Sequence, residues 1–230
     1  MILAPHQCKK SMSVRSASAF TKLDMMIVAG TLVMLSLWLV YGLERGRFAR
    51  PRAARINCVS NLKQVGLGFR MWSNDHDERF PWQVPVAGGG TKEMAELPYA
   101  VLHYVAASNE FNSPKILTCP EDRERTRTNL FNAPLHLSLS YFAGLNADET
   151  QPATILSGDR NVSISPSALV GLLAVQDATQ LQWTKDLHQN QGNIGLADGS
   201  VAQLSIAALR KSFNAALEAL TNQPVRLVIP

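Results

Sequence analysis

Met25–Leu43 (MMIVAGTLVMLSLWLVYGL) is a run of nineteen residues without a charged side chain. Its hydroxyl-bearing side chains are confined to Thr31, Ser36 and Tyr41, which an apolar helix tolerates. At a rise of about 1.5 Å per residue, a helix of this length nearly crosses the hydrocarbon core of a bilayer. Because no later stretch is apolar enough to cross again, the sequence predicts one transmembrane helix and one soluble part.

The leader before this run favours a cytoplasmic N-terminus. Residues 1–19 carry Lys9, Lys10 and Arg15 and no acidic residue. A secretory signal peptide has an apolar region of roughly 7–15 residues and then a small-residue cleavage site, whereas here the run is longer and ERGR follows it. Basic residues also follow the span, at Arg45, Arg47, Arg50, Arg52 and Arg55. The positive-inside rule alone therefore leaves the orientation open.

Composition limits the partners and the number of domains. The formal net charge of +4 comes mostly from the leader and from the arginines after the span. Contact with anionic lipid headgroups explains a basic cluster beside a membrane helix. Nucleic-acid binding is not expected, because the chain has no interleaved aromatic and basic residues and no binding motif. Residues 45–230 are enough for one ordinary domain.

A helix is predicted to continue beyond the membrane, because apolar residues recur every three or four positions. They are Ile56, Val59, Leu62, Val65, Phe69 and Trp72. Pro51 is expected to kink or break the helix between the span and this stripe. The helix should end near Asn74–Asp77. We interpret that cluster as a solvated helix exit, since it lacks the glycine and glutamate of a calcium loop.

The rest of the chain predicts short helices and strands. Helices are expected over Leu97–Ala107 and over Ser205–Leu220, the latter with its first serine as N-cap. Strands are expected over Ile116–Cys119, Leu137–Leu145, Ala153–Leu156, Ala168–Val175 and Leu181–Thr184. A charged, exposed loop is expected over Glu121–Arg127. Asp198-Gly199 predicts a two-residue hairpin turn with both residues at positive φ. The predicted fold class is therefore α+β.

Residues 19–26 (AFTKLDMM) place a small residue, a Phe and an acid just before the apolar run. This order resembles the cleavage site of type IV prepilins, in which a Gly precedes the cut, a Phe follows it and a Glu lies four residues later. Ala19 stands in place of the Gly, and Asp24 in place of the Glu. Lys22 replaces an apolar residue. The resemblance implies cleavage between Ala19 and Phe20 and methylation of the new N-terminus.

Two further segments extend the resemblance. Residues 58–67 (CVSNLKQVGL) are similar to the C-x-x-NLKQ-x-G segment that follows the membrane helix in many bacterial pilin-like proteins. The matching residues are Cys58, Asn61, Leu62, Lys63 and Gln64. His188 is followed after nine residues by Asp198-Gly199, as in the H-X9-DG signature of prepilin-type proteins. In this order, the three elements resemble pseudopilins of type II secretion or type IV pilus-like systems.

The resemblance implies a pilin-like fold, in which a long N-terminal helix packs its second half on an antiparallel sheet. It divides the chain into a leader (1–19), a transmembrane helix (20–44), an extracytoplasmic continuation of that helix (45–75) and a globular α+β head (76–230). The expected location is the bacterial inner membrane, with the head in the periplasm. The expected partners are further copies of the chain, other pseudopilins, the prepilin peptidase, the inner-membrane platform of the secretion machine and membrane lipid.

Asp24 has two interpretations that the sequence leaves open. A carboxylate at the membrane edge of an apolar helix is costly unless it is paired. In pilin-like proteins the matching acid is thought to pair with the new terminal amine of a neighbouring subunit, and here that amine would belong to Phe20. Alternatively, Asp24 only marks the helix start, where an acid suits the helix dipole.

The three cysteines divide between two compartments. Cys8 lies in the leader, on the reducing side of the membrane, whereas Cys58 and Cys119 would lie outside it, where disulfides persist. We predict a Cys58–Cys119 disulfide, with two buried thiols as the alternative. In the chain-entropy model, closing a loop of about sixty residues contributes about 4 kcal/mol to stability.

The sequence contains no recognisable catalytic motif, since the patterns G-x-S-x-G, H-E-x-x-H and paired C-x-x-C are all missing. We therefore interpret His188 as a structural residue whose ring bonds a backbone carbonyl across the hairpin, in preference to a catalytic base. Calcium binding by Asp148, Glu149 and Asp159 remains a weaker alternative to a role in turns. No other cofactor is expected.

Two hypotheses for function follow, and neither is enzymatic. The first is a pseudopilin-like structural subunit that anchors in the inner membrane and assembles through its N-terminal helix. The second is a membrane-tethered extracytoplasmic recognition domain, whose stem only anchors a head that binds a glycan or a protein partner.

Overall fold

The computed structural model describes residues 21–131, 134–164, 170–221 and 223–230, and for residues 44–52 it describes the backbone alone. The predicted processing site, Ala19-Phe20, lies outside the described residues. The chain divides into two compact units with a boundary between Phe48 and Ala49, and the first helix belongs to both.

Helix α1 (Lys22–Asn74) is one helix of 53 residues that ends where the sequence predicts. It passes through Pro51, so the helix does not break there, and the alternative, a kink, stays a prediction. A proline removes one hydrogen bond, and the long helical runs on either side hold the neighbouring turns. Lys22–Leu43, with a mean hydropathy of 2.1, is the one described helical segment long and apolar enough to cross a membrane.

The second half of α1 buries one face in the core of the second unit. The residues of this buried stripe are Cys58, Leu62, Val65, Phe69 and Trp72. Ile56, which was expected to belong to it, is 69% exposed. At about 100° per residue, Ile56 lies roughly 160° around the helix from Cys58, on the opposite face. The buried stripe therefore begins at Cys58, which the predicted stripe did not include, and Val59 is only partly buried.

The sheet of the second unit is antiparallel and has six strands in the order β4-β8-β1-β2-β6-β7. Its strands are β1 (Tyr141–Gly144), β2 (Ile155–Asp159), β4 (Gly171–Val175), β6 (Gly192–Leu196), β7 (Val201–Leu204) and β8 (Val225–Ile229). A separate pair joins β3 (Val162–Ser163) to β5 (Gln182–Trp183). The α+β class is confirmed.

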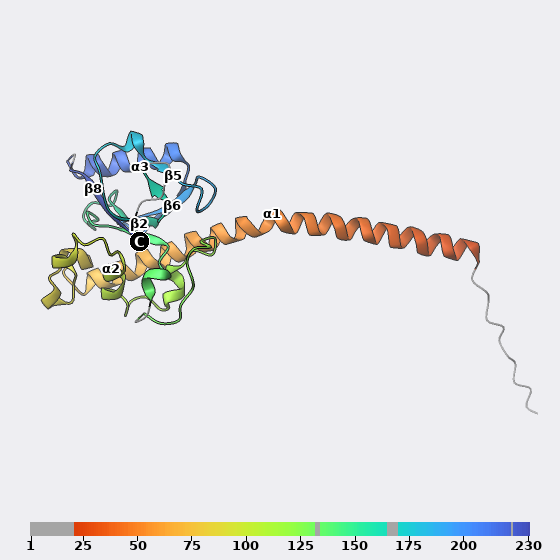
Figure 1. The fold of residues 1–230 in the computed structure, drawn as a ribbon, viewed down its shortest axis with the longest axis horizontal. Helices are drawn as coiled ribbons and strands as arrows, with labels where there is room; N and C mark the ends of the chain where they lie inside the picture. Colours follow the sequence, from red (N-terminus) through yellow and green to blue (C-terminus); the bar gives the residue numbers. More distant parts are fainter. Residues whose placement is uncertain (1–20, 132–133, 165–169, 222) are drawn as a thin grey trace, which may run out of the picture. The chain divides into compact units, whose positions relative to one another are not determined.

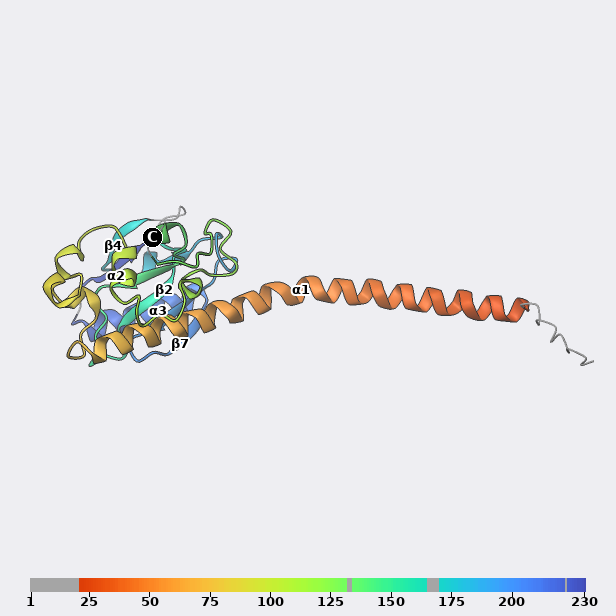
Figure 2. The ribbon, with the colours of Figure 1, turned by 90° about the horizontal axis from the view of Figure 1, so that it is seen from below.

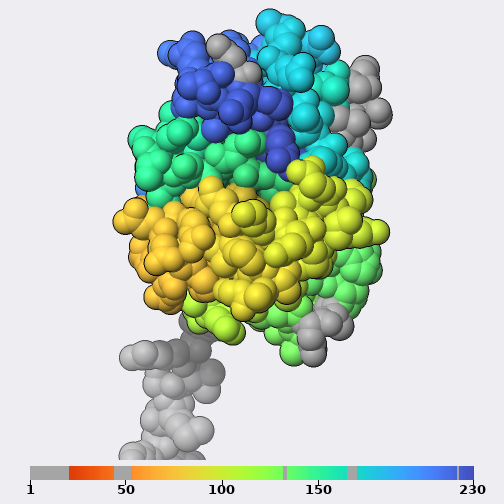
Figure 3. All heavy atoms as spheres, turned by 90° about the vertical axis from the view of Figure 1, so that its left-hand side faces the viewer, coloured from red at the N-terminus to blue at the C-terminus, as the bar shows by residue number. Residues whose placement is uncertain are grey.

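A helix covers each face of the large sheet. Along β1, Tyr141 and Ala143 belong to the core shared with α1, whereas Phe142 between them belongs to the core shared with α3 (Ile206–Ala219). Successive side chains of a strand point to opposite faces, so two apolar cores form with the sheet between them. Figure 1 shows α3 and the second half of α1 on opposite sides of the strands, Figure 2 shows the same ribbon from below with α1 in front of α3, and Figure 3 shows the three layers from one end.

The C-terminal strand is the strand of the large sheet that the sequence does not predict. Strand β8 (Val225–Ile229) pairs with both β1 and β4 and therefore lies inside the sheet. Three of its residues, Val225, Leu227 and Ile229, face the α3 core, whereas Val228 faces the α1 core. A short apolar run that is buried on both faces lacks the alternation that marks a half-exposed strand.

Several predicted boundaries need correction. Helix α2 (Val101–Ala106) is shorter than expected, because the chain turns at Pro98 before it. The strand predicted over Ile116–Cys119 is wrong: the chain forms a 3₁₀ turn, η4 (Pro114–Leu117), with Ser113 as its cap. A proline at the first helical position suits such a turn. Other 3₁₀ turns are η1 (Pro81–Gln83), η2 (Val86–Gly88), η3 (Lys92–Met94), η5 (Leu135–Leu137) and η6 (Ala178–Gln180).

The predicted β6–β7 hairpin is present, but its turn differs from the expected one. Only Gly199 has a positive φ, at 84°, and Asp198 does not. The Gly199 amide donates to the Leu196 carbonyl at 2.9 Å, and the Leu196 amide donates to the Ser200 carbonyl at 2.9 Å. The loop therefore has three residues and closes on a left-handed glycine, which is the next most common hairpin design. The helix after it, α3, begins at the expected cap, Ser205.

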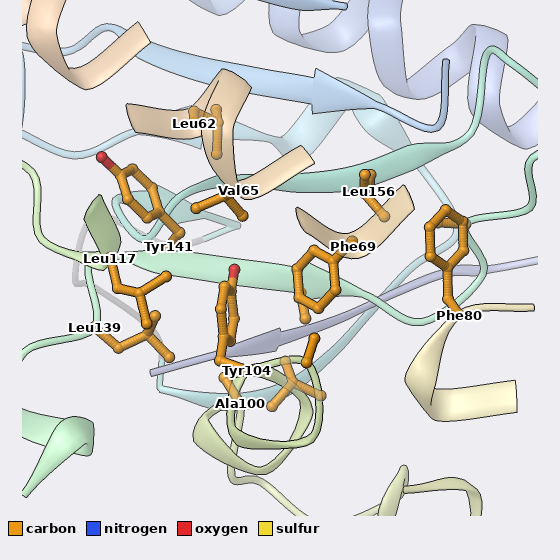
Figure 4. Packing of buried hydrophobic residues seen from close by; sticks show 14 of the residues in the cluster. Leu62, Val65, Phe69, Phe80, Ala100, Tyr104, Leu117, Leu139, Tyr141 and Leu156 are labelled. Atoms are coloured by element: carbon orange, nitrogen blue, oxygen red, sulfur yellow. The ribbon is translucent and has the colours of Figure 1, made fainter. Parts of the chain in front are cut away.

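Phe69 lies at the centre of the α1 core. Its ring contacts those of Trp82, Tyr104 and Phe111, with centroid separations of 5.4, 5.1 and 5.3 Å. Figure 4 shows Phe69 and Tyr104 pointing toward each other, with Leu156 of β2 beside them. Three sequence segments thus meet on one helical side chain, so the position of α1 and the packing of the 76–111 region depend on each other.

We expect Phe69→Ala to lower the free energy of unfolding of the second unit by about 3–5 kcal/mol, because it leaves a cavity among three aromatic rings. Leu67→Ala is the matched control, since Leu67 is on the same helix and 58% exposed. Its effect should stay within about 0.5 kcal/mol. Denaturation followed by tryptophan fluorescence measures both. Equal effects of the two variants would show that this face of α1 is not buried.

Candidate functional site

A disulfide joins α1 to the segment that follows η4. Cys58 and Cys119 are bonded and buried, with their Cα atoms 5.2 Å apart. One helical turn further on, the Asn61 side-chain amide donates to the Thr118 carbonyl at 3.2 Å. The predicted disulfide is confirmed. Two residues of the 58–67 motif thus hold α1 to the same short segment.

The His188 ring lies beside this disulfide and between two carboxylates. Its Nδ1 is 2.6 Å from Oε2 of Glu121, and its Nε2 is 3.3 Å from Oδ2 of Asp159. The same Nε2 lies 3.5 Å from Sγ of Cys119. The expected bond from this ring to a backbone carbonyl is wrong, because the ring partners are side chains. His188, Glu121, Asp159 and Cys119, together with Cys58 and Asn193, form what we call the His188 cluster.

The loop that carries His188 has an unusual backbone. His188, Gln189 and Asn190 have φ values of 51°, 54° and 63°, in the left-handed region that non-glycine residues rarely adopt. The Asn161 side-chain amide holds the loop by donating hydrogen bonds to three of its backbone carbonyls. These are the carbonyls of Thr184, Leu187 and Gln191, at 3.1, 3.0 and 3.0 Å. The His188 ring is thus fixed by its backbone as well as by its ring partners.

Asp159 is the most deeply buried acid of the cluster. Its Oδ2 accepts hydrogen bonds from the backbone and side-chain nitrogens of Asn193, at 2.7 and 2.9 Å. Its Oδ1 has no partner among the described residues. Burial raises the pKa of Asp159 to about 7. Burial also lowers the pKa of His188, although the Glu121 carboxylate opposes this. The fold therefore favours the uncharged forms of both groups near neutral pH.

The H-X9-DG signature is bound to α1 at both of its ends. Arg55 donates to the His188 carbonyl at 3.0 Å and to the Gln191 side chain at 2.8 Å. Four turns later along α1, Arg70 donates to the Asp198 carbonyl at 2.9 Å. A Cβ placed on Gly199 would lie 3.2 Å from Nη1 of Arg70. The His188 loop and the Asp198-Gly199 turn thus both bind the second half of α1.

The segment after Cys119 is less exposed than predicted. Asp122 is buried and accepts two hydrogen bonds from Arg160, at 2.8 and 2.9 Å, and one from Ser140 at 2.8 Å. Burial alone would raise the pKa of Asp122, but the bonds and charge of Arg160 outweigh it and hold the pKa below its ordinary value. The Asp122–Arg160 pair holds the end of strand β2, where Asp159 lies, and so helps to position the His188 cluster.

The remaining predicted residues lie apart from the cluster. In the 58–67 motif Leu62 is buried, whereas Lys63 and Gln64 are exposed, and the Gln64 side chain donates to the Ser60 carbonyl of its own helix. The calcium candidates do not meet among the described residues. Asp148 accepts hydrogen bonds from Thr150, Glu149 lies 3.6 Å from Arg70, and Asp159 is inside the His188 cluster. The interpretation of Asp159 as a turn residue is wrong, because it ends strand β2 and is buried.

Asp24 lies in the first turn of α1. Its Oδ2 accepts hydrogen bonds from the backbone amide and the hydroxyl of Thr21, at 2.9 and 2.8 Å, and the Thr21 hydroxyl accepts from the Asp24 amide at 3.3 Å. This reciprocal pattern is a capping box. The carboxylate faces back toward the residue that would follow the new N-terminus.

Sequence reasoning missed five residues of the site: Arg55, Glu121, Asn161, Arg70 and Asn193. Arg55 was assigned to the membrane-surface cluster, and Glu121 to an exposed loop. A signal was present for Glu121, because it follows Cys119 by two residues and a disulfide draws its neighbours into the interior. No local pattern distinguishes Asn161 from an ordinary turn residue.

We expect the free energy of unfolding of Asp159→Asn, relative to that of the wild type, to increase as pH rises. Between about pH 4 and 7 the folded wild type holds one proton more than the unfolded chain at this carboxyl, so its free energy of unfolding falls as pH rises. The variant has no carboxyl at this position and does not lose stability in this way. The difference in free energy of unfolding between the variant and the wild type should therefore shift by roughly 2 kcal/mol in favour of the variant between pH 5 and 7. Denaturant titrations at both pH values measure this. Asp75→Asn, at an exposed acid, is the control. A difference that does not change with pH would contradict the assignment.

Comparison of the chain with protein-family models, with curated proteins and with solved structures gives no match. The geometry above therefore carries the functional argument, together with the motifs at Ala19–Asp24, Cys58–Gln64 and His188–Gly199.

Proposed function

We propose that the chain is a pseudopilin-like subunit that anchors in the bacterial inner membrane and assembles through α1. The observation that carries the proposal is that the two halves of this one helix differ in burial. None of the apolar Lys22–Leu43 segment is buried within the chain, whereas the stripe from Cys58 to Trp72 is buried in the head. One part is available to lipid and to neighbouring helices, and the other holds the head.

The proposal places the head in the periplasm. A disulfide persists in an oxidising compartment, and the Cys58–Cys119 bond belongs to the second unit. The basic leader, with no acid in residues 1–19, favours retention of the N-terminus in the cytoplasm. Together these observations support a single-pass orientation with the disulfide outside.

In this proposal the mechanism is assembly and involves no catalytic step. Subunits associate through Lys22–Leu43 in the membrane, and movement of α1 along its axis carries the head with it. The attachments between α1 and the head suit that task, because a disulfide, two arginine contacts and a buried apolar stripe all act on one helix. The prepilin peptidase and a secretion or pilus-like platform are the partners that the proposal requires.

Asp24 would set the register between subunits. Cleavage between Ala19 and Phe20 would create an ammonium one residue before Thr21, on the side to which the Asp24 carboxylate points. An unpaired charge at the membrane edge is costly, so pairing with the ammonium of a neighbour favours one axial stagger of the helices. The same carboxylate then serves as a cap within its own helix and as a partner between helices.

Cysteine cross-linking in the membrane tests assembly. Single cysteines in place of Met34, Leu35 and Leu37 point in three directions about the helix. Positions 34 and 35 differ by about 100°, and positions 35 and 37 by about 200°. We expect oxidation to link copies strongly from one direction and weakly from the others. Asp24→Asn should reduce the linked fraction about tenfold, which corresponds to a pairing of about 1.4 kcal/mol.

Asp24→Glu is the matched control for this experiment. Asn keeps an oxygen that accepts from Thr21 but loses the charge, whereas Glu keeps the charge, so only Asn should weaken the links. The intact mass of the same protein reports whether the chain begins at Phe20. Monomers at all three cysteine positions, in a chain that still begins at Met1, would contradict assembly. That result would favour the membrane-tethered recognition domain.

A further inference from the structure

The His188 cluster brings together three groups that bind metals. The sulfurs of Cys58 and Cys119 and the nearest ring nitrogen of His188 all lie within 4.8 Å of one another, and all three residues are buried. They come from α1, from the segment after η4 and from the loop after β5. While the disulfide is intact, its sulfurs are not available as thiolate ligands.

Reduction would convert the same atoms into a ligand set. A phosphine reductant supplies two electrons: the sulfur–sulfur bond breaks, water provides the protons of the two new thiols, and the oxygen of that water ends in the phosphine oxide. Binding of a divalent cation then releases both thiol protons. The Cα atoms of the two cysteines are 5.2 Å apart. The sulfurs of two thiolates on one zinc ion lie roughly 3.8 Å apart, given Zn–S bonds of about 2.3 Å, and side-chain rotation from the bonded position reaches this separation.

The His188 ring is already oriented as a ligand. Glu121 lies 2.6 Å from Nδ1 and fixes the proton on that nitrogen, which leaves the Nε2 lone pair on the side of Cys119, 3.5 Å from its sulfur. A carboxylate that holds the far nitrogen of a ligating histidine is a common feature of metal sites, and it raises the basicity of the ligand.

The buried carboxyl of Asp159 also favours a cation beside His188. Asp159 is fully buried, lies 3.3 Å from Nε2 of His188, and has one carboxylate oxygen without a partner among the described residues. Burying a carboxylate that lacks full hydrogen bonding is costly unless a positive charge compensates it. A metal ion beside His188 would supply that charge.

We propose that the reduced protein binds one thiophilic divalent cation, Zn²⁺ in type, through Sγ of Cys58, Sγ of Cys119 and Nε2 of His188. Zinc takes three protein ligands of this kind with a fourth position left for water or carboxylate. The disulfide and the metal exclude each other, because both use the same two sulfurs. Either one ties α1 to the segment after η4, so the head would keep its attachment to α1 in oxidising and in reducing conditions.

Metal titration of the full-length chain in detergent micelles tests the proposal. A Cys8→Ser background leaves only the two thiols of the cluster, and a phosphine reductant opens the disulfide. Cobalt(II) is the probe, because thiolate-to-cobalt absorption reports sulfur ligation directly. We expect one Co²⁺ per reduced chain, displaced by one Zn²⁺, and no such absorption from the oxidised chain.

Two variants separate this site from simple chelation by a pair of thiols. His188→Ala should weaken Zn²⁺ binding by more than about tenfold, and Glu121→Gln, which keeps all three ligands, should weaken it about 10–100-fold. Circular dichroism checks that the reduced chain stays folded. The proposal is overturned if the folded, reduced chain shows no thiolate-to-cobalt absorption, or if His188→Ala binds zinc as tightly as the wild type. Loss of the fold on reduction would also overturn it, since the site requires the packed cluster.

Discussion

The burial of one face of α1 against the sheet is the constraint on which the rest of the second unit depends. The stripe from Cys58 to Trp72 supplies the centre of one apolar core, and β1 and β2 carry the opposing side chains. Without this helix that face of the sheet would be exposed, and the aromatic rings around Phe69 would lose their common partner. The second core, under α3, would remain, but the apolar burial of the first core would be lost.

Polar contacts fix where α1 lies on that surface. Apolar packing alone permits a helix to slide, whereas Arg55 and Arg70 reach defined carbonyls and Cys58 is covalently bonded. The His188 loop and the Asp198-Gly199 turn each accept hydrogen bonds from one arginine of α1, so both fix its position on the sheet. Burying His188 with Asp159 leaves groups whose charged forms are disfavoured, so the same cluster that positions the helix also responds to protons.

The sequence predicts the parts of this arrangement that depend on local pattern. The apolar run, the amphipathic continuation, the end of α1 near Asn74 and the cap at Ser205 follow from periodicity and capping. The disulfide follows from compartment reasoning. Long-range burial was not accessible: Glu121 and Asp159 resemble surface acids in the sequence, and β8 is buried on both faces and lacks the alternation of a half-exposed strand. Ile56 matched the spacing but lies on the exposed face, because each step of three residues turns about 60° around the helix, so two such steps place Ile56 about 120° from Leu62.

Hydrogen exchange of the full-length chain in micelles tests most directly whether the second half of α1 is an integral part of the head. The account predicts that amides from 58 to 72 exchange as slowly as those of β1 and β8, and that Phe69→Ala accelerates all of them together, as expected of one cooperative unit. Rapid exchange of 58–72 while β1 and β8 remain protected would contradict the account, because α1 would then be a separate stem that only lies beside the head.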